Sequence, residues 1–129
     1  MTATPLIAAV LLLLVTFLST HVSSLRIKHR ISLGEGENRD LFRAIRAHAN
    51  ALEHVVPFVL LSLLLEETTG LSDLVLIAGV AFIVARLLHA FGMLRRIHRA
   101  RQLGATLSVM IEIVLGVLLL RVGAGLVGL

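Results

Sequence analysis

Four long apolar stretches follow one another within only 129 residues, and they limit the folds open to this chain. The first, from Pro5 to Leu25, contains no charged side chain at all. A helix needs roughly 20 such residues to cross the hydrocarbon of a bilayer. We therefore expect an all-α membrane protein, a single domain of four transmembrane helices at about 5–29, 39–66, 72–94 and 103–124.

Composition narrows the functions that such a bundle can have. The chain has no Cys, so disulfides, thiolate metal sites and a cysteine nucleophile are excluded. The formal net charge of +4 does not indicate nucleic-acid binding, because Trp and Tyr are absent and only five Phe could stack on bases. We expect no metal site either, since His48 and His54 are six residues apart and do not share a helix face. Anionic headgroups or an anionic small ligand are the expected partners.

The basic residues predict the topology. They gather after the first apolar stretch and again between the third and fourth, whereas the connection between the second and third, near Glu66 and Asp73, is acidic. The positive-inside rule places the two basic connections in the cytoplasm. Both chain termini are then expected on the other side of the membrane.

Several polar side chains lie inside the predicted spans and must be paired, hydrated or near an interface. Two stripes descend from the basic side: Arg46, Asn50 and Glu53 in the second span, and Arg86, His89 and Met93 in the third. They form either ion pairs that hold the bundle together, with Glu53 joined to Arg46 or Arg86, or a pocket for a zwitterionic or anionic ligand. Glu112 stands alone in the fourth span, where an interhelical hydrogen bond is its simplest role.

Two sequence motifs resemble those of a known family. The run 43–58, RAIRAHANALEHVVPF, resembles the signature of the MAPEG family, the membrane-associated proteins in eicosanoid and glutathione metabolism. A second similarity is 85–92, ARLLHAFG, and the Gly34-Glu-Gly36 loop resembles the short bacterial branch of that family. The resemblance covers nearly the whole chain and implies a multi-pass protein of the bacterial inner membrane.

The resemblance also implies a ligand and an assembly. Glutathione would be the co-substrate, without a metal, and would bind between neighbouring protomers of a homotrimer at the cytoplasmic side. The glutathione-contacting positions that carry over are Arg26, Arg46, His48, Asn50, Glu53, His54, Arg86 and His89. The arginine that faces the thiol in catalytic members falls at Arg99 or Arg101, and Arg101 is preferred because it directly precedes the predicted fourth helix.

From this resemblance we expect a glutathione transferase or peroxidase acting on lipophilic electrophiles or lipid hydroperoxides. An arginine beside the sulfur would stabilise the thiolate, so the protein would need no nucleophile of its own. A non-catalytic MAPEG-fold protein that binds a lipid or a partner is the main alternative. A small multidrug exporter is a third, disfavoured because its essential Glu belongs in the first span, which here is uncharged.

Overall fold

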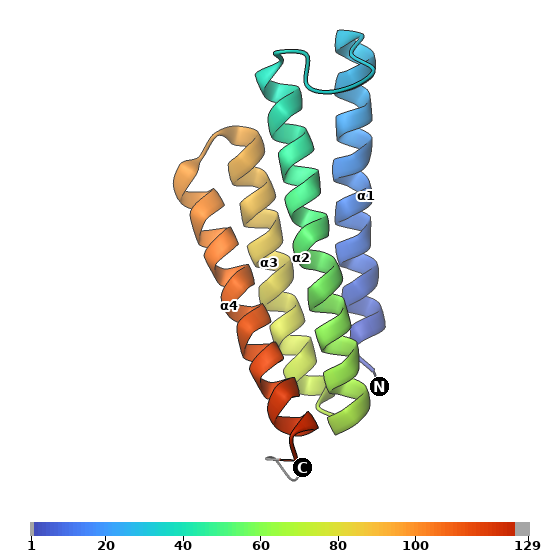
Figure 1. Ribbon diagram of the computed structural model, residues 1–129, viewed down its shortest axis with the longest axis vertical. Helices are drawn as coiled ribbons and strands as arrows, with labels where there is room; N and C mark the ends of the chain where they lie inside the picture. The colour runs from blue at the N-terminus through green and yellow to red at the C-terminus, as the bar shows by residue number, and fades with distance from the viewer. Residues whose placement is uncertain (1, 126–129) are drawn as a thin grey trace.

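The computed structural model describes residues 2–125 as a bundle of four antiparallel helices (Figure 1). They are α1 (Thr4–His29), α2 (Arg39–Thr69), α3 (Ser72–Arg95) and α4 (His98–Gly123). Each is long and apolar enough to span a membrane. The bounds agree closely with those expected, except that α4 begins at His98 rather than near residue 103.

The connections follow from local chain chemistry. Arg30 ends α1 in the left-handed conformation, and Gly34 and Gly36 also have positive φ values, which glycine adopts at little cost. Asn38 caps α2, because its side-chain oxygen accepts hydrogen bonds from the backbone N–H groups of Asp40 and Leu41. At the opposite end, Gly70 at φ 71° closes the short turn into α3.

A buried carboxylate joins the start of α1 to the end of α2. Glu66 is 4% exposed, and its two oxygens accept hydrogen bonds from the N–H groups of Ala3 at 2.6 Å and Thr4 at 2.9 Å. The first N–H groups of a helix have no intrahelical partner, so a carboxylate there satisfies them and complements the helix dipole. The sequence suggested only an acidic turn here, whereas one of its acids is a structural cap.

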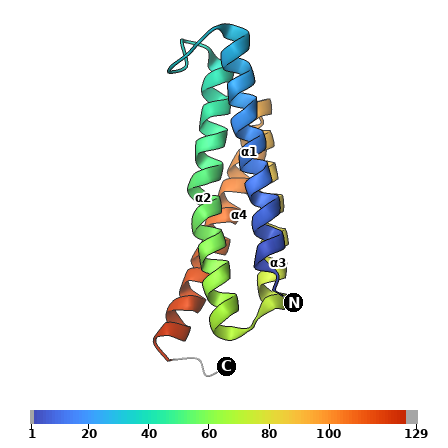
Figure 2. The same cartoon turned by 90° about the vertical axis from the view of Figure 1, so that its right-hand side faces the viewer.

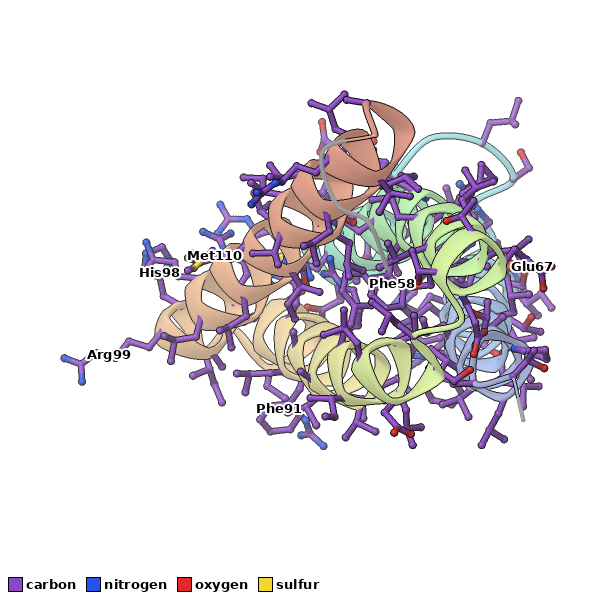
Figure 3. The ribbon with its side chains drawn as sticks, turned by 90° about the horizontal axis from the view of Figure 1, so that it is seen from below. Phe58, Glu67, Phe91, His98, Arg99 and Met110 are labelled. Carbon is purple, nitrogen blue, oxygen red and sulfur yellow. The ribbon has the colours of Figure 1, made fainter. Side chains whose placement is uncertain are left out.

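The apolar core lies where α1, α2 and α3 meet. Phe58 and Phe82 stack with their ring centroids 3.9 Å apart, and Phe58 lies between the helices in the view along the bundle (Figure 3). The fourth helix contacts α3 and α2 but, within the described residues, not α1. It lies at the edge of the bundle in Figure 1 and behind α1 and α2 in Figure 2. Its buried residues are only Gly104, Ser108 and Leu115, which leaves most of its apolar surface open.

Candidate basic cavity and inner polar cluster

A cavity of about 470 Å³ opens at the basic end of the bundle, between the start of α2, the end of α3 and the start of α4. We call it the basic cavity. Its lining residues are Arg39, Phe42, Arg43, Gly92, Met93, Arg96, His98 and Arg101. Within residues 2–125, no Asp or Glu lines it. The cavity therefore presents four guanidinium groups to anything that enters.

Close packing of α4 on α3 brings Arg101 into this cavity. A Cβ atom at Gly92 would collide with the backbone of Arg101, and one at Gly104 would lie 2.5 Å from the backbone nitrogen of His89. Glycine at both positions lets the helix axes approach. Arg101 also donates a hydrogen bond to Nδ1 of His98 at 3.1 Å, and both residues line the cavity.

The early start of α4 changes the setting of the two candidate thiol-facing arginines. Both Arg99 and Arg101 lie in the first turn of α4, so Arg101 does not precede the helix as expected. The turn from α3 is shorter than the basic run suggested, because Arg96 adopts a left-handed conformation and Ile97 alone leads into α4. Arg101 lines the basic cavity, whereas Arg99 extends away from the bundle (Figure 3).

Asp40 lies outside the basic cavity but holds two of the arginines that line it. Its carboxylate accepts from Arg43 at 3.1 Å and from Arg96 at 2.9 Å. These pairs are largely solvent-exposed, so each contributes little to stability, but together they fix where the two guanidinium groups lie. Within the described chain, neither Arg39 nor Arg101 pairs with a carboxylate, so their charge is available to a ligand.

Below the cavity lies what we call the inner cluster: Asn50 and His54 of α2, Arg86 and His89 of α3, and Glu112 of α4. Arg86 is only 1% exposed and donates from Nη2 to the side-chain oxygen of Asn50 at 3.0 Å. Its Nε and Nη1, and Nδ1 of His89, have no hydrogen-bond partner within the described chain. Arg86 and His89 are thus closed inside the protomer rather than open to the basic cavity.

The interhelical hydrogen bond expected for Glu112 is confirmed, and its partner is His54 of α2. Both oxygens of Glu112 lie within hydrogen-bond distance of Nδ1 of His54, at 3.0 and 3.1 Å. The two side chains are 17% and 21% exposed and connect α4 to α2. Sequence reasoning predicted the role of Glu112 but not its partner, because the two residues are 58 positions apart and no local spacing relates them.

The remaining candidates lie elsewhere. Arg46 and Glu53 are exposed on the side of α2 that faces away from the bundle, and within residues 2–125 neither forms an ion pair. His48 is half-buried. Arg26 donates to the carbonyls of Ser32 and Gly34, so it fastens the α1–α2 loop. One protomer therefore does not bring all the predicted glutathione contacts together.

Comparison with known proteins assigns this chain to a family. The sequence profile described as the MAPEG family matches residues 4–121, which is nearly the whole described chain. The chain belongs to the MAPEG family. The family assignment, the four spanning helices and the multi-pass membrane character expected from the sequence are thus confirmed.

Two curated relatives are similar to this MAPEG protein. They are inner membrane protein YecN of Escherichia coli K12 and of Escherichia coli O6:H1. Each is 36% identical over 93 residues, which cover 72% of this chain and 70% of the relative. Their name states a location in the membrane and no reaction, so the chemistry must be argued from the site.

Proposed function

We propose that this MAPEG protein binds glutathione in the basic cavity and activates its thiol for reaction with a lipophilic substrate. The observation that carries the proposal is a cavity lined by four arginines and no carboxylate within the described residues. Glutathione has two carboxylates and one ammonium group, so its net charge suits this excess. The cavity volume of about 470 Å³ lies in the roughly 300–1,000 Å³ range of small-molecule sites.

The outer side of α2 supports a site completed by a second copy of the chain. Glu53 lies near the middle of α2, and Pro57 has no N–H to donate to its backbone carbonyl. A charged side chain exposed to lipid at mid-helix costs about 2.5–3.5 kcal/mol on insertion scales. Contact with a neighbouring protomer in a homotrimer would remove Arg46 and Glu53 from lipid. Glu53 would then be placed to hold the ligand's ammonium group.

Arg101 is the residue we assign to the thiol. A free thiol has a pKa of about 8.5, so little thiolate exists at neutral pH. A guanidinium beside the sulfur favours the charged form and lowers this pKa. In the transferase reaction, the thiolate attacks an electrophilic carbon, a sulfur–carbon bond forms, and the leaving group departs with its electron pair. In the peroxidase reaction, two glutathione molecules reduce ROOH to ROH and water and become the disulfide.

The second substrate would arrive through the membrane. Phe42 is exposed on α2 and lines the basic cavity together with Met93, so apolar side chains border the site. By the positive-inside rule, this cavity would face the cytoplasm and both termini the opposite side. We place the chain in the bacterial inner membrane by its similarity to the two relatives.

Calorimetry with detergent-purified protein tests the binding proposal. Wild type should bind glutathione, and Arg46→Ala, Glu53→Gln and Arg101→Gln should each weaken binding. Arg121→Gln is the matched control, because it removes the same charge from the other end of α4. No binding by a folded wild type, or equal weakening by the control, would contradict the proposal. The non-catalytic alternative would then be the better description.

Thiol activation has a separate readout. The ultraviolet absorbance of the thiolate can be followed against a low protein background, because the chain has no Cys, Trp or Tyr. We expect bound glutathione to ionise at a pH at least about one unit below the free thiol, equivalent to about 1.4 kcal/mol. The shift should disappear in Arg101→Gln and persist in Arg101→Lys. Binding without any change in ionisation would remove Arg101 from the thiol-activating role.

A further inference from the structure

A second cavity at the basic end has no part in the proposed reaction. It has a volume of about 510 Å³ and lies between α1 and α3, with the start of α2 at its base. We call it the interfacial groove. Its lining residues are His21, Leu25, Asp40, Arg43, Leu94, Arg95 and Arg96. Arg43 and Arg96 border both cavities, whereas Leu25 and Arg95 belong to the groove alone.

The groove lies at the level where a membrane surface is expected. The α1–α2 connection extends beyond the α3–α4 connection, so the end of α3 lies beside α1 rather than at its tip (Figure 1). The apolar residues of the groove, Leu25 and Leu94, each precede basic residues in their own helix, Arg26 and Arg95. This change from apolar to basic is typical of the boundary between hydrocarbon and headgroups.

The groove also faces away from the surface that we propose to be covered in a trimer. Asp40 and Glu53 are thirteen residues apart on α2. At about 100° per residue, the angle between their side chains around the helix is about 140°. An assembly built on the outer side of α2 would therefore leave the interfacial groove open to lipid.

We propose that the interfacial groove binds the phosphate of an anionic phospholipid. Three arginines, one carboxylate and the imidazole of His21 face it. Asp40 already accepts from Arg43 and Arg96, whereas Arg95 forms no ion pair within residues 2–125. Arg95 is the guanidinium free for the phosphate, and Leu25 and Leu94 contact the acyl chain. A soluble phosphate would gain nothing from these two leucines, so a lipid suits the groove better.

Native mass spectrometry of the detergent-purified full chain tests this site. Phosphatidylglycerol and phosphatidylcholine with identical acyl chains are offered together, and the ratio of the two retained lipids is measured. Wild type should prefer phosphatidylglycerol, and Arg95→Gln should reduce that preference about fivefold, the effect of one basic residue at an anionic surface. Asp40→Asn should increase the preference, because it leaves two arginines without their carboxylate.

Two control variants distinguish lipid binding in the groove from general attraction of anionic lipid to the basic end of the bundle. Arg99→Gln removes the same charge from the same end of the bundle but from a side chain that extends away from it (Figure 3), so the ratio should not change. Leu25→Ser should lower the retention of both lipids and leave their ratio unchanged. Equal effects of Arg95→Gln and Arg99→Gln, or no preference in wild type, would overturn the proposal. So would full displacement of the lipid by soluble glycerol phosphate.

Discussion

The hydrogen bond between His54 and Glu112 is the contact whose removal tests this structure most directly. It joins α2 to α4, whose other buried contacts are few, and its atoms are 3.0 Å apart. We expect the His54→Ala and Glu112→Ala variants each to destabilise the bundle. In each case the partner left behind loses its hydrogen bond within the membrane, where water does not replace it easily.

The size of the expected destabilisation follows from the geometry of the His54–Glu112 contact and from its burial. Hydrogen bonds to charged groups contribute about 1.5–3 kcal/mol in proteins, whereas interhelical bonds in membrane proteins average about 0.6 and reach about 1.7 kcal/mol. Because both side chains are mostly buried, at 17% and 21% exposed, we expect a coupling energy near the upper membrane value, about 1.5 kcal/mol. Each single variant should then cost about 2 kcal/mol and the double variant about 2.5 kcal/mol.

The assay is a double-mutant cycle of unfolding free energy in mixed detergent micelles. Unfolding is followed by circular dichroism, because the chain has no Trp or Tyr to report fluorescence. The protein concentration is held constant, since any oligomer makes stability depend on it. Val56→Ala and Val114→Ala form the control cycle, as both residues are half-exposed on the same two helices. For the control cycle, the costs of the two single substitutions should add to within about 0.5 kcal/mol. If the costs of His54→Ala and Glu112→Ala also add to within that value, the pairing is refuted.

Two further predictions concern the ends and packing of the helices. Glu66→Gln removes the carboxylate cap of α1 and should cost about 1–2 kcal/mol of unfolding free energy, whereas the same change at exposed Glu67 should cost little. A stability loss equal at both positions would contradict the cap. Gly104→Ala should cost about 1–3 kcal/mol because its Cβ would meet the backbone of α3. Gly116→Ala, where nothing lies within 4 Å, should be neutral or stabilising by up to about 1 kcal/mol, and the same unfolding assay compares the two.

The positions of the spans could be predicted because hydropathy acts locally. Each helix is identified by its own run of apolar residues, so the expected bounds needed no knowledge of tertiary contacts. The start of α4 was placed too late because the run 95–101 contains five basic residues or histidines and reads as a loop. A single left-handed residue, Arg96, is enough to reverse the chain, and the polar first turn of α4 projects beyond the apolar part of the helix.

The candidate site was predicted less well because its partners are distant in sequence. Periodicity placed Asn50 and Arg86 on facing stripes, and the structure joins them by a hydrogen bond. The same periodicity could not show that Glu112 would pair with His54 or that Glu66 would cap α1, since those contacts span 58 and more than 60 residues. Nor could it show that Arg26 is held by its own loop. The spacing of residues shows which side chains share a helix face, whereas contacts between the faces of different helices depend on how the helices pack.

The polar residues of the candidate site are divided among the basic cavity, the inner cluster and the outer side of α2. The inner cluster is closed within one protomer, and its buried Arg86 is held by Asn50 on α2. Glu53 follows Asn50 by three residues and points outward from the same helix. The inner cluster therefore fixes the rotation of α2, and that rotation places Glu53 and Arg46 on its outer side. If the proposed function holds, Arg86 would act through the position of α2, and direct contact with glutathione would fall to the basic cavity and the outer side of α2.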